Sequence, residues 1–396
     1  MRLASLLLLY GALTGTLAAV LAPGEAQAYP WMIRHGYANC AACHVDPSGA
    51  GLLTQYGRAQ SELLLATQYR KRAEDQEVSP YTAFALGAVD LPEWLNLGLS
   101  FRGAYLSTRA GEVRDSRWLH MVTDLRGAAS LGPLRAGASV GFLHLRGLPA
   151  ALTSREQNNL VSREHWVGLA DPDETLLLRV GRVNLPFGLR NVEHTTWVRE
   201  QTRTDINEDQ QHGVALAYNS EKVRAELMAI AGNLQLSPSD YRERGYAGYV
   251  ELALSKKAAV GVSSLMTRAR YDVTTQQPFS VRQAHGLFGR WSPQRHLVLL
   301  AEVDFLAQRP QGEDASTGYT SLLQADLELI QGVHVLLAGE TLRQRGATSL
   351  GAWVSLDWFI GPHAELRLDV NPRRLGVPGG ESLNVLLLLA QLHLTL

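Results

Sequence analysis

Both cysteines of the 396-residue chain lie in one short stretch, Cys40-Ala41-Ala42-Cys43-His44. This spacing is typical of covalent c-type haem attachment, in which two thiols bond to one porphyrin edge and the adjacent imidazole coordinates the iron. Two other interpretations use the same cysteines. A thioredoxin-like redox pair needs a βαβ setting that the neighbouring residues do not offer, and a structural disulfide leaves His44 unexplained. We therefore expect one covalently bound haem c, held by Cys40 and Cys43, with His44 as the proximal iron ligand.

The second axial ligand of such a haem is the open part of the site. Met32 and His35 lie on the segment that leads into Cys40 and are the two candidates for this ligand. A distal Met raises the haem potential relative to a bis-histidine pair, which suits a chain that accepts electrons. His35 precedes Cys40 by a loop too short to reach the opposite haem face easily, so a surface or propionate-binding role is its alternative. Met228 and His120 are further candidates if their strands turn them inward.

Residues 1–28 have the pattern of a secretory signal peptide. Arg2 supplies the positive start, residues 3–21 are mostly apolar, and Ala26-Gln27-Ala28 matches a small-x-small cleavage site. The mature chain is expected to begin near Tyr29. Because bacterial c-type haem is attached outside the cytoplasmic membrane, the leader and the haem motif support each other.

The rest of the composition narrows the class of protein. With 37 basic and 38 acidic residues the net charge is near zero, so no nucleic-acid partner is indicated. After the leader, the longest apolar run is Val385–Ala390, far shorter than a membrane-spanning helix requires.

Residues 29–80 are predicted to form a small helical c-type monohaem domain, and residues 81–93 a linker. A turn cluster follows His44 at residues 46–51, and a helix is expected over residues 52–72. The charged residues 71–77 are then expected to form a solvated linker. The apolar stripe of the helix, which either covers one haem face or belongs to an ordinary connector, consists of Leu52, Tyr56, Ala59, Leu63 and Ala66.

From residue 94 to residue 396 the pattern changes to strict alternation. In residues 297–308, for example, Val303 and Phe305 alternate with Glu302 and Asp304. A soluble sandwich would bury the apolar face, whereas a membrane barrel turns it to lipid and the polar face to a watery lumen. The strands are long, follow one another without helices and carry clustered charges, which favours a transmembrane antiparallel β-barrel of about 16 strands in the all-β class.

The sixteen predicted strands are Trp94–Leu106, Arg117–Leu131, Leu134–Arg146, Asn159–Ala170, Thr175–Leu185, Gln211–Tyr218, Val223–Ala231, Arg244–Leu254, Ala258–Asp272, Arg282–Trp291, His296–Gln308, Thr317–Ile330, Val333–Arg343, Ala347–Phe359, His363–Val370 and Ser382–Leu396.

Two further patterns concern the ends and the inside of the barrel. Long links such as residues 191–210 should lie outside the cell and tight turns such as residues 132–133 in the periplasm. Aromatic residues near strand ends suggest interfacial girdles, namely Trp94, Trp118, Trp166, Trp291, Trp353, Trp358 and Phe359. Carboxylates predicted to face the lumen either attract hard cations such as Fe(II) or pair with neighbouring arginines such as Arg367; they are Glu302, Asp304, Asp326, Glu328, Asp357, Glu365 and Asp369.

A leader, one Cys-x-x-Cys-His motif and a barrel that runs to the C-terminus resemble the fused monohaem cytochrome–porins of the bacterial outer membrane, known chiefly as iron oxidases. Only Cys40, Cys43 and His44 match as a motif. Residues 181–189, Gly-Arg-Val-Asn-Leu-Pro-Phe-Gly-Leu, are similar to a strand-and-loop signature of phosphate-selective-type porins. The chain departs from outer-membrane barrels at its end, where Leu396 replaces the usual aromatic residue.

This resemblance implies an exported protein of the bacterial outer membrane, surrounded by lipid. It would move electrons between an extracellular donor such as Fe(II) and a periplasmic carrier cytochrome, and would be an oxidoreductase at most. Three alternatives stay open: electron flow in the outward direction, a solute-diffusion porin with a haem plug, and a soluble periplasmic cytochrome with a β-domain.

Overall fold

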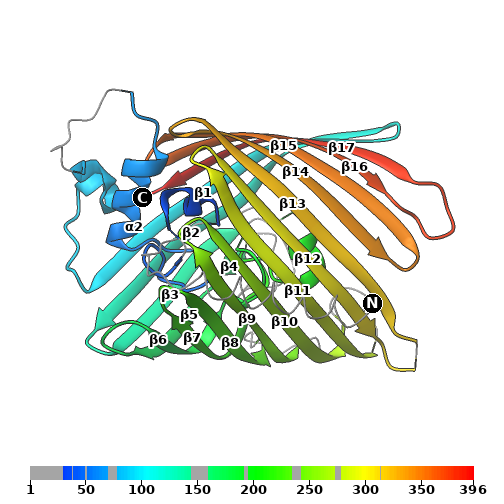
Figure 1. Ribbon diagram of the computed structural model, residues 1–396, viewed down its shortest axis with the longest axis horizontal. Coiled ribbons are helices and arrows are strands. Elements are labelled where there is room, and N and C mark those ends of the chain that lie inside the picture. Colours follow the sequence, from blue (N-terminus) through cyan, green and yellow to red (C-terminus); the bar gives the residue numbers. More distant parts are fainter. Residues whose placement is uncertain are drawn as a thin grey trace, which may run out of the picture.

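The fold is a closed barrel. The computed structural model describes residues 30–37, 39–49, 51–69, 78–143, 159–190, 195–233, 242–272, 278–312 and 314–396. Successive strands pair antiparallel, and β1 pairs with both β2 and β17, which closes the sheet (Figure 1). Strands β4 and β5 both pair with β3 and together occupy one strand position of the barrel. The predicted all-β antiparallel barrel of 16 strands is therefore confirmed.

The strands of the barrel are β1 (Leu95–Ala110), β2 (Val113–Leu131), β3 (Leu134–Leu143), β4 (Asn159–Val161), β5 (His165–Ala170), β6 (Leu176–Val183), β7 (Gln211–Asn219), β8 (Val223–Gly232), β9 (Arg244–Ser255), β10 (Ala258–Tyr271), β11 (Pro278–Gln294), β12 (Leu297–Arg309), β13 (Ser316–Ile330), β14 (Val333–Gln344), β15 (Ala347–Gly361), β16 (Ala364–Leu375) and β17 (Leu383–Thr395).

Each predicted strand has a counterpart among these, and one is interrupted. The strand predicted over residues 159–170 breaks between β4 and β5 because the Ser139 hydroxyl accepts the backbone N–H groups of Arg163 and Glu164, at 2.9 and 3.0 Å. These two N–H groups therefore do not join the regular ladder, and the Arg163 side chain is buried beside Asp124.

The two faces of the strands differ as the alternation predicts. On β12, Val303 and Phe305 are exposed on the outside while Glu302 and Asp304 are buried inside. This outward apolar surface suits lipid, and the inward polar one suits a lumen. None of the described helices is both long enough and apolar enough to cross a membrane.

The aromatic girdle prediction holds for only part of its set. Trp94, Trp118, Trp291 and Trp358 are exposed on the outside. It is wrong for the inward Trp166, Trp353 and Phe359. Trp166 is buried against the guanidinium of Arg179, 5.5 Å from its ring centroid; Trp353 donates a hydrogen bond to Glu340 at 2.9 Å; and Phe359 lies 5.8 Å from the ring of Trp31.

Link length separates the two ends of the barrel. The end that holds the C-terminus has only short turns, such as residues 132–133 and 256–257. The opposite end has the longer connections, including residues 184–210 and 233–243, but also two tight turns at residues 111–112 and 345–346. The predicted contrast therefore describes the barrel as a whole rather than every link.

The N-terminal segment lies within the short-turn end of the barrel (Figure 1). It contains η1 (Pro30–His35), α2 (Gln55–Gln60) and the π-helical turn η2 (Ser61–Leu65). Ile33 of η1 is fully buried in a cluster with Leu189, Phe288 and Leu300 from a lumen loop and the barrel wall. We call residues 30–69 the plug.

The predicted helix over residues 52–72 is shorter, and its predicted apolar stripe is buried only in part, at Leu52 and Ala66. Thr54 caps α2 by accepting the N–H of Gly57 at 3.0 Å, and the chain becomes extended at Ala66. Leu65 packs on the plug core while Tyr56 of the predicted stripe is exposed. The predicted end at residues 70–72 and the charged residues 73–77 lie outside the described residues, as does the leader, residues 1–28.

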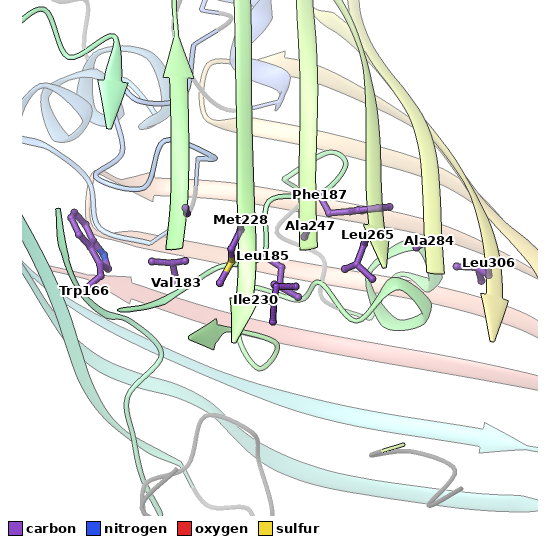
Figure 2. Packing of buried hydrophobic residues seen from close by; sticks show 11 residues of the cluster. Trp166, Val183, Leu185, Phe187, Met228, Ile230, Ala247, Leu265, Ala284 and Leu306 are labelled. Carbon is purple, nitrogen blue, oxygen red and sulfur yellow. The ribbon is translucent and has the colours of Figure 1, made fainter. Parts of the chain in front are cut away.

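The predicted linker, residues 81–93, contains two short 3-10 segments, η3 (Pro80–Thr82) and η4 (Phe84–Gly87). The long connection after β6 folds into the barrel instead of away from it. Residues 184–190 are buried, and α3 (Trp197–Thr202) follows them. Leu185 and Phe187 pack with Met228 and Ile230 of β8 and with Leu265 of β10 (Figure 2). The lumen is therefore filled by this loop as well as by the plug.

Candidate functional site

The Cys-x-x-Cys-His stretch forms one tight turn inside the barrel. The N–H groups of Cys43 and His44 both donate to the carbonyl oxygen of Cys40, at 3.1 and 3.0 Å. Cys40 and Cys43 are free thiols and both are buried, so no disulfide joins them. Thr54 connects this turn to α2, because its N–H donates to the Cys43 carbonyl at 2.9 Å.

Close packing around Cys40 depends on one glycine. Gly49 has φ +96°, and a Cβ at this position would lie 2.7 Å from the sulfur of Cys40. The same sulfur accepts a hydrogen bond from Arg224 of β8, which also forms an ion pair with Glu251 of β9. Glycine thus lets the loop after His44 return against the first thiol.

The plug is fastened to the barrel wall by buried ion pairs. Arg34 lies 2.8 Å from Asp326 and 3.4 Å from Glu328, both on β13. Asp46, two residues after the motif, accepts a hydrogen bond from Asn184 at 2.7 Å and lies 3.5 Å from Arg179 of β6.

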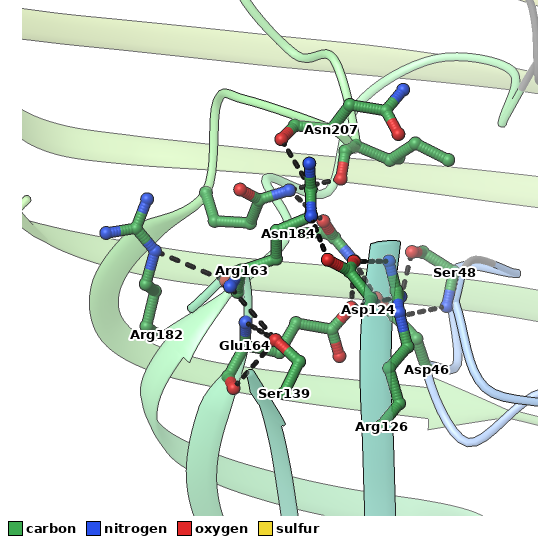
Figure 3. A network of polar contacts seen from close by, with 12 residues as sticks. Asp46, Ser48, Asp124, Arg126, Ser139, Arg163, Glu164, Arg182, Asn184 and Asn207 are labelled. Atoms are coloured by element: carbon green, nitrogen blue, oxygen red, sulfur yellow. Dashed lines mark hydrogen bonds and ion pairs between the residues drawn. The ribbon is translucent and has the colours of Figure 1, made fainter. Parts of the chain in front are cut away.

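A polar network surrounds Asp46 (Figure 3). Burial alone would raise the pKa of this carboxyl, but Arg179 and Arg190 lower it to about 2. Asp46 is therefore ionised at neutral pH, and its charge connects the residues after His44 to β6.

A cavity lies between the plug and the wall formed by β1, β2 and β17. Its empty volume is about 1120 Å³, including its open mouth. His44 lines it from the plug side, together with Gly49, Leu52 and Leu53. The polar side chains on its lining also include Arg58, Arg102, Arg126, His363 and His393.

These residues fit a haem. The macrocycle is largely apolar and carries two carboxylates, so it needs apolar contacts, cationic groups and iron ligands together. The cavity offers Leu52, Leu53 and Leu99 as apolar contacts, arginines for the carboxylates and the ring of His44. Cys40 adjoins it through Gly49, and Leu53 contacts both thiols.

The structure does not bring the predicted distal ligands to this cavity. Met32 is 2% exposed and packs in the plug core with Trp31 and Ile33. His35 lies near Arg34 and Arg295, and burial together with these charges lowers its pKa to about 4. Neither residue is part of the cavity lining.

The two further candidates on strands have other roles. Met228 does face inward, where it is fully buried against the lumen loop and Gly213. The expectation that His120 faces the lumen is wrong. Its ring lies 6.0 Å from Phe101 and 5.6 Å from Phe142, two rings exposed on the outer surface.

The sequence analysis missed the residues that line the cavity from the wall. His393 and Arg102 occupy paired positions on β17 and β1. Both stand at polar positions between apolar neighbours, so the same alternation that identified the strands could have placed them inside. No sequence signal connects them to Cys40.

The seven carboxylates predicted to face the lumen all lie on the inner face of β12, β13, β15 and β16. Most have a basic partner: Glu302 pairs with Arg199, Glu365 with His393, and Asp369 with Arg367 at 2.7 Å. Asp304 differs, because among the described residues neither of its oxygens has a hydrogen-bond partner. Pairing with basic groups, which was the alternative to cation binding, therefore accounts for most of these carboxylates.

Comparison with known proteins identifies the fold. No family model and no curated protein matches the sequence. Among solved structures, the chain is similar to OmpT of Vibrio cholerae, with 9% identity, a TM-score of 0.57 and coverage of 76% of this chain and 97% of OmpT. It is also similar to an anion-selective porin from Comamonas acidovorans, with 11% identity, a TM-score of 0.55 and coverage of 76% and 99%.

The outer membrane channel DcaP of Acinetobacter baumannii gives a comparable result, with 9% identity, a TM-score of 0.54 and coverage of 76% and 97%. At these identities the likeness concerns the fold alone: the chain has the fold of bacterial outer-membrane porins. The barrel part of the resemblance to cytochrome–porins is confirmed, and its cytochrome part stays a prediction.

Proposed function

We propose that this chain is an outer-membrane, porin-type barrel whose plug carries one covalently bound haem c and passes electrons between an extracellular donor, Fe(II), and a periplasmic carrier cytochrome. One observation supports this above the others. The Cys40–His44 turn lies inside a closed barrel, beside a cavity lined by His44 and three arginines.

Each residue of the site has a distinct task in this proposal. A bound haem supplies one-electron storage at its iron. Cys40 and Cys43 fix the group to the plug, His44 ligates the iron, and Arg58 and Arg102 neutralise its carboxylates. The barrel wall keeps lipid, whose hydrocarbon core is about 30 Å thick, away from the site.

The orientation of the barrel in the membrane follows from the lengths of the links between its strands. In bacterial outer-membrane barrels the short turns face the periplasm, which puts the plug and its motif on the side of a periplasmic acceptor. Among the lumen-facing carboxylates, Glu302 and Asp304 lie near the middle of β12, whereas Asp326, Glu328, Asp357 and Glu365 lie nearer the short-turn end. Their oxygens suit a hard divalent cation such as Fe(II), although most are already paired with basic groups.

A solute-diffusion porin with a structural plug is the second candidate, and the comparisons favour it more directly. Two of the similar structures are described as an anion-selective porin and an outer membrane channel. Against free diffusion stands the packing inside the barrel, where Ile33 of the plug and Leu185, Phe187 and Trp197 of the connection after β6 are buried. Outward electron transfer is a third candidate with the same site and the opposite current.

The test is an absorption spectrum of sealed, right-side-out outer-membrane vesicles before and after addition of Fe(II) and then dithionite. Reduced haem bands with Fe(II) alone are expected. Bands that appear only with dithionite would favour another donor or outward flow. Absence of haem from the correctly matured chain would overturn the proposal, and solute uptake unchanged by Cys40→Ala, with no electron flow in either protein, would select the diffusion porin.

A further inference from the structure

The cavity beside His44 contains a second imidazole with the geometry of a metal ligand. His393 belongs to β17, the last strand, and faces the lumen beside Arg102 of β1. Its side chain and that of His44 line the same space, one from the wall and the other from the plug. The cavity therefore has one imidazole on its plug side and another on its wall side.

The two ring nitrogens of His393 have different partners. Nδ1 lies 3.0 Å from Oε2 of Glu365, whereas Nε2 lies 3.0 Å from the hydroxyl oxygen of Ser100. A carboxylate only accepts hydrogen bonds when ionised, so Nδ1 carries the proton when it pairs with Glu365, its nearer contact, and Nε2 keeps its lone pair, accepting the Ser100 hydroxyl. In this tautomer the guanidinium of Arg102, which only donates, lies close to Nδ1 without a hydrogen bond to it. Metal-ligating histidines usually donate their other ring N–H to a carboxylate, which fixes the ring and raises the basicity of the free nitrogen.

The other wall imidazole on the cavity lining, His363, already contacts backbone carbonyl oxygens. Nδ1 of His363 lies 2.6 Å from the carbonyl oxygen of Thr395, and Nε2 lies 2.5 Å from that of Tyr81. Each ring nitrogen of His363 therefore already lies against a backbone carbonyl oxygen. His363 thus holds the segment before β1 to the barrel.

Cationic groups complete the surroundings. Arg102 lies 3.3 Å from Nδ1 of His393, and Arg58 and Arg126 line the same cavity. Guanidinium groups are well suited to bind the two carboxylates of a porphyrin in fixed positions. The wall therefore offers an oriented imidazole and the plug a second one, with arginines on both.

We infer that His393, oriented by Glu365, is the second axial ligand of the haem iron opposite His44. This inference rests on the proposed function, since it requires a haem at Cys40 and Cys43. It replaces Met32 and His35 in that role. A bis-histidine iron has a lower reduction potential than a His/Met iron, so this site releases an electron to a partner more readily than the predicted Met ligand would allow.

The experiment uses the full chain, matured with haem and purified in detergent. Haem content is measured by pyridine haemochrome after denaturation, and ligation by the absorption and electron paramagnetic resonance spectra of the folded ferric protein. We expect a low-spin bis-histidine signal in the unaltered chain and its complete conversion to a high-spin signal in His393→Ala. Added imidazole should restore the low-spin signal, because it occupies the vacated side of the iron.

Matched variants separate ligation from structure. His363→Ala removes the other cavity imidazole and should keep the low-spin signal, while His393→Met should give a His/Met spectrum and a higher potential. Glu365→Gln should keep the low-spin signal but raise the potential, since an amide makes Nε2 less basic.

Different results would refute the proposed function and the assignment of His393 as a ligand. An unaltered chain without covalent haem would refute the proposed function. Covalent haem with an unchanged low-spin spectrum in His393→Ala and His393→Met would refute this inference alone, and a change in Met32→Ala or His35→Ala instead would assign the ligand to the plug. Folding of each variant is checked by the heat-dependent gel migration of the barrel.

Discussion

Removing one buried cation should loosen the plug without unfolding the barrel. Arg34 of η1 is fully buried, lies between Asp326 and Glu328 of β13 and stacks 5.6 Å from the ring of Trp31. Arg34→Met keeps much of the side-chain length and apolar contact but removes the charge. Two carboxylates then lie close together without this cation, and the ring of His334 lies 2.9 Å from Asp326.

The magnitude follows from this geometry. Breaking a buried ion pair by removing one partner costs about 3–5 kcal/mol, because the other charge stays buried without compensation. Since 1.4 kcal/mol is a factor of ten in an equilibrium constant, the opening of residues 30–37 should become about 100- to 4000-fold more frequent. The hairpins of the barrel do not depend on this pair and should be unaffected.

Hydrogen exchange with mass spectrometry measures this opening. Peptides from residues 30–37 should exchange faster by that factor in Arg34→Met, while peptides from β10 and β11 keep their protection. Asp326→Asn combined with Arg34→Met should recover part of the loss, because the unpaired carboxylate is removed. The exposed pair Arg117–Asp115, 4.0 Å apart, is the control, and Arg117→Met should change stability by less than about 1 kcal/mol.

A tenfold or smaller change in exchange for Arg34→Met would contradict the reasoning, as would strict additivity of the two substitutions. Either result would mean that the plug is held by its apolar cluster rather than by this ion pair. Faster exchange throughout the barrel would show instead that plug and wall unfold as one unit.

The remaining predictions concern four other positions inside the barrel. Burial and the nearby Asp205 raise the pKa of Asp209 from 3.8 to about 7, so its protonated form is favoured in the folded loop. The stability that this group contributes is fully present below pH 4 and is lost as the pH rises to 7, by about 4 kcal/mol at most. Hydrogen exchange of residues 203–210, corrected for intrinsic rates, should show this loss of stability. Asp209→Asn should abolish the pH dependence. Gly49→Ala should lower covalent haem per folded barrel severalfold, measured by haem stain, because its Cβ displaces the Cys40 sulfur; equal loading would refute the close approach. Asp304→Asn should leave the free energy of unfolding unchanged or higher, whereas Asp369→Asn should lower it by about 3 kcal/mol because it removes the buried ion pair with Arg367. Urea titration of both variants decides, and equal losses would contradict this.

Much of the barrel could be predicted because side-chain direction in a strand is a local property. Successive residues point to opposite faces, so the alternation of Val303 and Phe305 with Glu302 and Asp304 was enough to predict both the strand and its two environments. Consecutive antiparallel strands then pair with their sequence neighbours through short turns, and the even strand number brings both ends of the barrel domain to one side.

The helix and the aromatic girdles were less predictable, for a physical reason. Which face of a short helix is buried depends on what packs against it, and here the plug core selects Leu65 rather than Tyr56. A Trp near a strand end can face lipid, as Trp118 does, or the lumen, as Trp166 does beneath Arg179. The residue that packs against such a side chain, and so decides which way it faces, lies far away in the sequence.

For the candidate site, the sequence by itself determined the Cys-x-x-Cys-His motif, because Cys40, Cys43 and His44 lie within one turn of the chain. Only the tertiary structure decided what faces that turn. Closure of β17 on β1 brings His393 and Arg102 to the cavity that His44 lines, and buries Met32 and His35 away from it. Contacts between residues so distant in sequence arise from barrel closure, which no local pattern of residue types records.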